Sequence, residues 1–261
     1  MSHSEISRFL TEASSGRLNR RQVLERGLGL GVSTAVLTSM YMQAPEANAA
    51  PGPVSRGLTG MRQDDEPLTI MIVDGVTDAD PHSNYSTYGA IVTLTCYDML
   101  VNYKGLSTTE YEAMLAESWT ISDDLTTFTF KIRANATFHD GTPCTAQSVK
   151  DSMVRFRRLE MGPYLVLARF CDDPENMITV PDDTTVVFTL PKAEPLFMAA
   201  MASSYGPYTV NMKRVDENKT DDDPWAHEWF VTNADGTGPY KMTRNDFKEG
   251  ISFEWHDGYW G

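Results

Sequence analysis

The chain has 261 residues, of which 41% are hydrophobic, and its formal net charge is −14. This apolar content can fill a hydrophobic core, which excludes a wholly disordered protein. The 3 cysteines are too few for a disulfide scaffold. The acidic balance argues against a nucleic-acid partner, because phosphate backbones are bound by clustered Lys and Arg. The length allows one large domain or two smaller ones.

The N-terminus has the pattern of an export signal. Residues 1–27 are polar and include the pair Arg20-Arg21, and an apolar stretch follows at residues 28–42. This stretch is too short to span a bilayer, which requires about 20 residues. The arginine pair and the apolar stretch behind it resemble a twin-arginine signal.

A cleavage pattern follows the apolar stretch. Ala47-Asn48-Ala49 is the small-x-small sequence that signal peptidases cut. We therefore expect residues 1–49 to be a signal peptide, with a short uncleaved membrane anchor as the alternative. Residues 50–66 have Pro and Gly near their start and three acidic residues at their end, which predicts a flexible leader.

The first predicted elements after the leader are a strand and a helix. Residues 68–73 are almost continuously apolar, which favours a strand covered on both faces. After a turn at residues 80–84, Ser86 or Thr87 can cap a helix whose apolar residues follow helical spacing. The apolar positions predicted for this helix are Ala90, Ile91, Leu94, Tyr97 and Val101.

The middle of the chain predicts further strands and helices. Apolar and polar residues alternate over 128–132 and over 186–190, which indicates two half-buried strands. Thr145 caps a helix with one apolar face, formed by Val149, Met153 and Phe156. Pro195 fits the first turn of a helix over residues 196–202, and residues 251–256 alternate as a final strand. The pattern predicts an α+β fold without internal repeats.

Several short motifs follow one another in a fixed order. They are LAESW at 115–119, SDD at 122–124 with FTF at 128–130, FHDGTP at 138–143, GTGPY at 236–240 and GYWG at 258–261. In this order they resemble the family 5 extracellular solute-binding proteins, the binding components of dipeptide, oligopeptide and nickel ABC importers. The resemblance covers residues 67–261, and FHDGTP together with GTGPY is its most specific part.

The resemblance implies a two-lobed fold of the periplasmic-binding-protein kind, type II, cluster C. Lobe I would comprise residues 67–105 and 195–261, and residues 106–194 would form an inserted subdomain. Members of the family are considerably longer, and their ligand lies between lobe I and a second lobe. We therefore interpret the chain as an N-terminal fragment in which only the first lobe and its inserted subdomain are present.

The resemblance also suggests which residues contact a ligand. The loop after the first predicted strand would reach the cleft at Tyr85, Ser86 and Thr87, and Tyr205 and Tyr259 are further candidates. Hydroxyl groups and aromatic rings suit the polar and apolar parts of a peptide or small solute. As alternatives, Ser86 or Thr87 is only the helix cap and Tyr259 is a core aromatic residue.

The sequence shows no spacing typical of a catalytic or metal-binding site. We expect His139 to pack within its turn, and His82 either to cap its loop or to contact ligand. Cys96 should be buried. Cys144 and Cys171 either pair in a disulfide or remain free, and the sequence does not decide between the two. Paired acidic residues should be solvated in polar turns. These pairs are Asp123-Asp124, Asp172-Asp173, Asp182-Asp183 and Asp221-Asp222-Asp223.

The function implied by the resemblance is substrate binding for an ABC importer. The protein would capture peptides or a related small solute in the periplasm and deliver it to the permease subunits, as a monomer when full length. No enzymatic activity, cofactor, metal or nucleic acid is implied. The alternative is an exported cofactor-dependent enzyme, which the twin-arginine pattern suggests, with its site in the missing C-terminal half.

Overall fold

The computed structural model describes residues 75–167, 169–246 and 250–261. They all belong to one structural unit, Ile70–Gly261. The predicted signal peptide, leader and first strand lie outside the described residues. No helix in the described part of the chain has the length and apolar character needed to cross a membrane.

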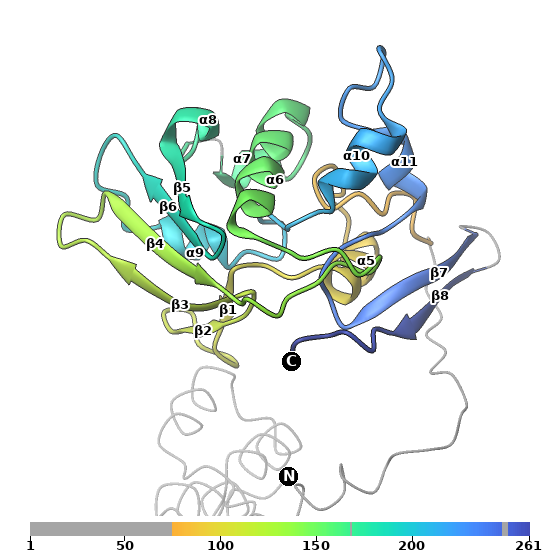
Figure 1. The fold of residues 1–261 in the computed structure, drawn as a ribbon, viewed down its shortest axis with the longest axis horizontal. Coiled ribbons are helices and arrows are strands. Elements are labelled where there is room, and N and C mark those ends of the chain that lie inside the picture. The colour runs from red at the N-terminus through yellow and green to blue at the C-terminus, as the bar shows by residue number, and fades with distance from the viewer. Residues whose placement is uncertain (1–74, 168, 247–249) are drawn as a thin grey trace, which may run out of the picture. The chain divides into compact units, whose positions relative to one another are not determined.

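A four-stranded antiparallel sheet occupies the middle of the chain (Figure 1). Its strands lie in the order β3 (Ala116–Ile121), β4 (Thr127–Ile132), β6 (Thr185–Thr189) and β5 (Ile178–Asp182). The predicted alternation is confirmed in β4 and β6, where every second residue is buried. Their register places Phe128 opposite Phe188 and Phe130 opposite Val186, so the inward-facing side chains of both strands meet on one face.

The helix α6 (Ala146–Leu159) packs against β5 and β6. Thr145 caps it as predicted, in a capping box in which the Thr145 N–H donates to Ser148 Oγ at 3.2 Å. Its predicted apolar residues are buried. The helix ends at Glu160, which has a left-handed backbone with φ of 51°. The short helices α7 (Tyr164–Leu167) and α8 (Pro174–Met177) follow before the chain enters β5.

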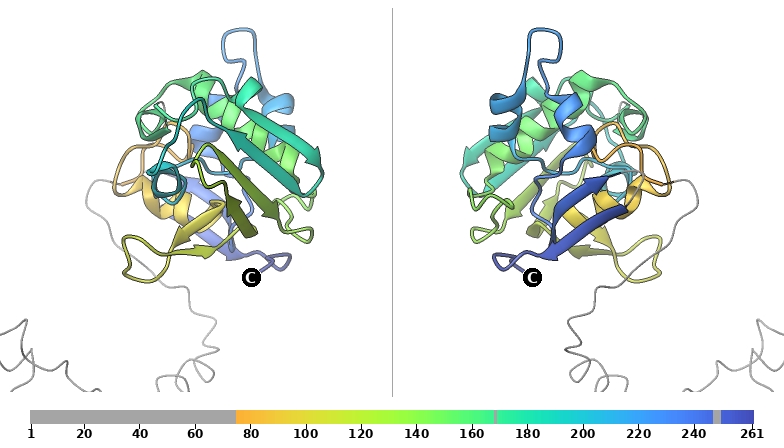
Figure 2. Two further views of the ribbon diagram at one scale, coloured as in Figure 1. Left: turned by 90° about the vertical axis from the view of Figure 1, so that its left-hand side faces the viewer. Right: turned by 90° about the vertical axis from the view of Figure 1, so that its right-hand side faces the viewer.

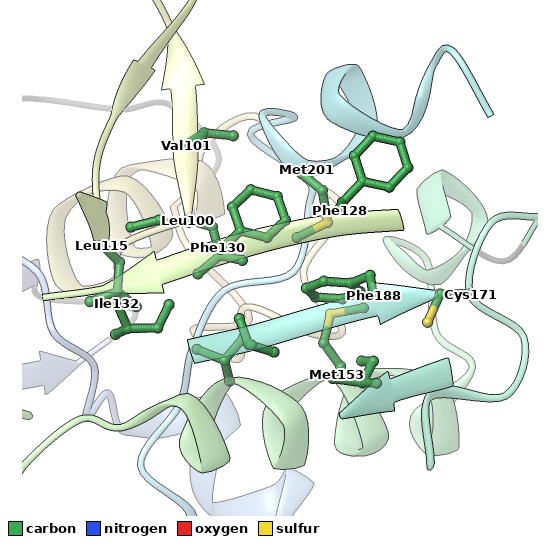
Figure 3. Packing of buried hydrophobic residues seen from close by; sticks show 14 of the residues in the cluster. Leu100, Val101, Leu115, Phe128, Phe130, Ile132, Met153, Cys171, Phe188 and Met201 are labelled. Carbon is green, nitrogen blue, oxygen red and sulfur yellow. The ribbon is translucent and has the colours of Figure 1, made fainter. Parts of the chain in front are cut away.

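A first hydrophobic core joins the sheet to α6 and to α9 (Phe197–Met201). Figure 3 shows side chains of β4, β6, α6 and α9 in this core. Phe197 lies at its centre, with ring centroids 4.5 Å from Phe128 and 5.4 Å from Phe188. Cys144 and Cys171 are also buried there and both are free thiols, so the disulfide left open above is not formed.

A second core lies among the remaining elements. It is formed around α5 (Gly89–Cys96), α10 (Met212–Asn218), α11 (His227–Thr232) and the hairpin of β7 (Tyr240–Asp246) and β8 (Gly250–Trp255). The hairpin packs against α5, as Figure 2 shows. The buried members of the first core lie between Leu100 and Ala202, and those of the second lie before and after that stretch.

The apolar face predicted for α5 is wrong. The helix ends at Cys96, and Val101 already belongs to β1 (Val101–Tyr103), which pairs with β2 (Tyr111–Ala113). Leu94 is 50% exposed. The buried residues instead recur at the spacing of one helix face, as Gly89, Val92, Thr93 and Cys96. A Cβ on Gly89 would come within 1.9 Å of the Asn84 side chain. Because Gly89 has no side chain, this face of the helix can approach Asn84 closely and pack inward.

Candidate functional site

Two of the predicted ligand residues, Tyr85 and Tyr205, meet in the structure. Tyr85 lies in the loop before α5 and is 58% exposed, and Tyr205 lies in the turn after α9. Their ring centroids are 4.7 Å apart, with the planes tilted by 54°. Gly162 also packs closely against Tyr85, because a Cβ on Gly162 would lie 2.7 Å from the Cβ of Tyr85. Three separate segments thus meet at two aromatic residues in contact, the exposed Tyr85 and the partly buried Tyr205, which we call the tyrosine pair.

Ser86 and Thr87 lie in different surroundings. The Ser86 hydroxyl donates to Asn84 Oδ1 at 2.9 Å and accepts the Gly89 N–H at 3.0 Å. Ser86 therefore satisfies a free N–H at the start of α5 from two positions before the N-cap, which is Tyr88 and has no capping side chain. Thr87 is exposed next to Tyr85.

Tyr259 lies in a different cluster. Within the described residues its ring contacts are Trp255, at 5.8 Å, and Trp260, at 4.9 Å, and neither member of the tyrosine pair is among them. Burial raises the pKa of the Tyr259 hydroxyl to about 12, and nearby Asp98 adds to the effect. The structure therefore separates Tyr259 from the other candidates.

Asp98 ties two of the sequence motifs together. Its Oδ2 accepts the Trp260 Nε1–H at 2.9 Å and the Thr237 hydroxyl at 3.0 Å, and its side chain is buried. Burial raises the pKa of Asp98 to about 6, although these donors oppose the shift. Thr237 belongs to GTGPY and Trp260 to GYWG. These motifs therefore shape the interior of the fold.

The glycines of GTGPY have a steric role. A Cβ on Gly236 would lie 2.3 Å from the Cys96 carbonyl oxygen, and one on Gly238 would lie 2.5 Å from the Cys96 carbonyl carbon. The Gly238 N–H also donates to the Cys96 oxygen at 3.0 Å. Only a residue without a side chain allows the two backbones to approach this closely.

A buried polar network was missed by the sequence analysis. Arg155 of α6 forms two hydrogen bonds to Asp80, from Nη1 to Oδ1 at 2.9 Å and from Nη2 to Oδ2 at 2.6 Å, and both side chains are 0% exposed. Asp80 and His82 flank a proline in the loop that leads to Tyr85. Two ionisable residues in one short turn were the available signal. Their partner lies 75 residues further along the chain, where no local pattern indicates it.

His82 has a defined tautomer in this network. Arg155 Nη1 lies 3.0 Å from His82 Nδ1, and an arginine can only donate, so Nδ1 accepts. Nε2 then carries the proton and donates to the Tyr208 carbonyl at 2.8 Å. Burial lowers the pKa of His82 to about 4, and the charge of Arg155 acts in the same direction. Of the two roles proposed for His82, the geometry fits the structural one.

The charges in the network have fixed roles. Burial opposes ionisation of Asp80, but the Arg155 guanidinium holds the pKa of that carboxyl well below its ordinary value. His227 Nδ1 lies 3.0 Å from Asp80 Oδ2, and this hydrogen bond raises the pKa of the partly exposed His227 ring. Asp80 is therefore an anion between two donors.

The other residues weighed in the sequence take structural places. His139 has a packing role, but its contacts lie outside its own turn: Nε2 lies 3.1 Å from the Gly238 carbonyl and the ring meets His256 at 5.1 Å. Cys96 is buried and free, and burial raises its pKa. The paired acidic residues are exposed, apart from the partly covered Asp223. Among the described residues, no group of three or more His, Cys, Asp or Glu is arranged to hold a metal ion.

An open cavity of about 350 Å³ lies beside the turn that carries Tyr205. The residues that line it are uncharged and come from α5, from β1 and its approach, and from the end of α9. Apolar Leu94 and Met99 contribute to the wall, and Ser203 and Ser204 contribute hydroxyl groups. The wall of this open hollow is therefore a mixture of apolar and uncharged polar groups.

A family model described as bacterial extracellular solute-binding proteins, family 5 Middle, matches residues 110–261. The chain belongs to this family. Among relatives, the "Probable D,D-dipeptide-binding periplasmic protein DdpA" of Escherichia coli (strain K12) is 31% identical over 182 residues, 67% of this chain and 34% of that protein. The "Dipeptide-binding protein" of the same strain is 29% identical over 190 residues, with the same two shares. The chain thus spans 34% of the length of each, and both are named as binding proteins.

Solved structures of the family share the fold. The periplasmic binding protein DppA of Helicobacter pylori, in complex with the peptide STSA, gives a TM-score of 0.60 at 25% identity. The murein tripeptide binding protein MppA of Escherichia coli gives the same TM-score and identity. Each match covers 72% of this chain and 38% of the other. These matches confirm the predicted α+β fold of the periplasmic-binding-protein kind.

Proposed function

We propose that the protein is the solute-binding component of an ABC importer and that it captures a peptide or a related small solute in the periplasm. The observation that carries this proposal is family membership, because the family is described as solute-binding proteins and several matched relatives and structures are named for peptide binding. No covalent chemistry is needed for this function. The protein would bind its solute by closure around it and deliver it, as a monomer, to the permease subunits.

The ligand would lie on the tyrosine pair. Tyr85 offers an exposed ring, and Thr87 next to it offers an exposed hydroxyl. The adjacent hollow would take an uncharged part of the solute, because its wall offers apolar contacts and hydroxyl groups but no charged partner. Tyr259 would instead pack with Trp255 and Trp260.

The domain organisation and the export route are part of the same proposal. We divide the fold into lobe I, at residues 67–105 and 195–261, and an inserted subdomain at residues 106–194. The presence of two hydrophobic cores favours two parts, but the first core runs from Leu100 to Ala202 and so extends beyond the inserted subdomain at both ends. Export would use the twin-arginine pattern at Arg20-Arg21, with cleavage after Ala49.

The test is a thermal-shift screen of the purified protein against named probes. The probes are L-Ala-L-Ala, D-Ala-D-Ala, L-Ala-L-Phe, a tripeptide, free amino acids and a nickel–histidine complex. Binding at 100 times Kd stabilises the native state by about 2.7 kcal/mol, which a melting curve resolves. We expect a concentration-dependent rise of Tm with at least one peptide. If Tm stays constant with every probe, the proposed function is wrong for these solute classes.

A further inference from the structure

The guanidinium of Arg155 connects α6 to the loop that carries Tyr85. It is bound to both oxygens of Asp80 and to Nδ1 of His82. The loop after Asp80 forms a turn in which the Asp80 carbonyl accepts the Ser83 and Asn84 N–H groups, at 3.2 and 2.9 Å. Asn84 Oδ1 in turn accepts the N–H of Ser86 at 2.9 Å, so Tyr85 lies between two residues whose positions are fixed from Asp80.

The same network reaches the segment that carries Tyr205. His82 Nε2 donates to the Tyr208 carbonyl at 2.8 Å, and the Tyr208 hydroxyl donates back to the Ser204 carbonyl at 3.0 Å. Ser152, one turn before Arg155 on α6, exchanges hydrogen bonds with the Val210 N–H and carbonyl, at 3.0 and 3.3 Å. Tyr205 is thus enclosed by a segment that α6 and His82 fix together.

We propose that Arg155 is the positioning residue of the tyrosine pair: through Asp80 and His82 it fixes, from one side chain, both segments that bring Tyr85 and Tyr205 together. The importance of this for ligand binding rests on the function proposed above. Arg155 is fully buried and reaches the tyrosine pair only through the two loop residues.

The charge balance explains why arginine is required at this position. A buried carboxylate without its partner is strongly unfavourable, and a lysine ammonium lacks the planar fork that serves two acceptors at once. Arg155 also donates from Nε to the Trp225 carbonyl at 3.0 Å and stacks over Phe230 at 4.4 Å. A lysine at this position would keep the positive charge but could not form the two parallel hydrogen bonds to Asp80.

The network predicts a pH-dependent loop. A proton on His82 Nδ1 would face the Arg155 N–H, so the bond that links the two segments requires neutral His82. The charged and titratable groups around it are Arg155 on α6, Asp80 on its own loop, and His227 of α11 bound to Asp80. Acidification should therefore loosen both segments together.

The test compares Arg155→Lys with Arg158→Lys as the matched control. Arg158 is on the same helix but about half exposed, where it pairs with Glu175. Amide hydrogen exchange of the full chain is followed in peptides covering residues 80–89 and 203–210. We expect faster exchange, by at least tenfold, in both peptides of Arg155→Lys and no change in the control. Exchange that stays unchanged in either peptide would overturn the proposal.

His82 supplies a second pair of variants. In His82→Gln the amide can accept from Arg155 and donate to Tyr208, whereas His82→Leu can do neither. We expect His82→Gln to keep slow exchange at neutral pH and to remove the acid-induced loosening, and His82→Leu to behave as Arg155→Lys does. Equal exchange in the two His82 variants would contradict the proposal.

Binding of D-Ala-D-Ala and L-Ala-L-Ala separates this inference from the proposed function. We expect Arg155→Lys to raise Kd at least tenfold and the control to leave it unchanged. An unchanged Kd in Arg155→Lys would overturn the role in binding, even where exchange is faster. If the unaltered protein binds neither dipeptide, the proposed function fails for them, and the exchange data still decide whether Arg155 positions the tyrosine pair.

Discussion

The guanidinium carbon of Arg133 lies 4.1 Å from the centre of the Trp260 ring. Trp260 also donates its indole N–H to the buried Asp98 carboxylate. One aromatic side chain therefore combines a cation–π contact with a hydrogen bond to an acid. The motif GYWG contributes this residue, and the two contacts can be separated by mutation.

Trp260→Phe should destabilise the protein by about 1–3 kcal/mol, because a smaller aromatic ring remains but the indole N–H that binds the buried Asp98 carboxylate is lost. Urea unfolding gives the free energy. Trp255→Phe is the control, since Trp255 is 52% exposed and should change stability by less than about 0.5 kcal/mol. Equal effects in both variants would contradict the role given to Asp98.

Gly238→Ala should cost at least about 2 kcal/mol of unfolding free energy, because its Cβ would meet the Cys96 backbone at 2.5 Å. Gly258→Ala is the matched control: there the closest atom, at 2.9 Å, belongs to the His256 side chain and not to backbone. Its effect should be clearly smaller. A Gly238→Ala protein with unaltered Tm would show that the backbones can separate at no cost.

Stability should depend on pH through His82 and His227 in opposite directions. His82 has a folded pKa of about 4 against an ordinary 6.5, so its contribution is complete above pH 6.5 and declines as pH falls toward about 4, by at most about 3 kcal/mol. The raised pKa of His227 gives a contribution that is complete below pH 6.5 and is lost as pH rises through the raised value.

The measurement is the urea midpoint as a function of pH for His82→Gln, His227→Gln and the unaltered protein. Taking differences from the unaltered protein removes the titration of other groups. His82→Gln should reduce the decline on the acid side, and His227→Gln should reduce the decline on the alkaline side. A variant whose pH profile runs parallel to that of the unaltered protein would refute the assignment for that histidine.

Tyr85→Ala should raise the Kd of a bound peptide about tenfold, which corresponds to about 1.4 kcal/mol. The loss of unfolding free energy should be only about 0.5–1.5 kcal/mol, the value of one aromatic pair. Tyr240→Ala removes another exposed tyrosine, on β7, and should not change Kd. Calorimetric titration with the dipeptides used above measures Kd for both variants. A similar rise in Kd for the two variants would remove the tyrosine pair from the binding surface.

The sequence patterns correctly predicted those parts of the fold that depend only on residues close together in the chain. The alternation in β4 and the capping box at Thr145 each depend on neighbours within a few residues, and the structure confirms both. The face of α5 was wrong because its packing depends on the close approach of Gly89 to Asn84, and the simple hydrophobic count favoured larger side chains.

Only part of the candidate site could be predicted from the sequence. Tyr85 and Tyr205 were selected separately by resemblance, and only the fold shows that their rings meet. Arg155 was not selected, because an arginine within a helix is usually a surface residue. Its burial depends on Asp80 and His82, which lie in a distant part of the sequence.

The order β3-β4-β6-β5 has a consequence for how the protein folds. The pairs β3–β4 and β5–β6 are each joined by a short turn, whereas β4 and β6 are separated in sequence by α6, α7, α8 and β5. Closing that long loop costs chain entropy before the ladder forms. The two hairpins should therefore form early, and the meeting of Phe130 with Val186 should belong to the rate-limiting step of folding in this sheet.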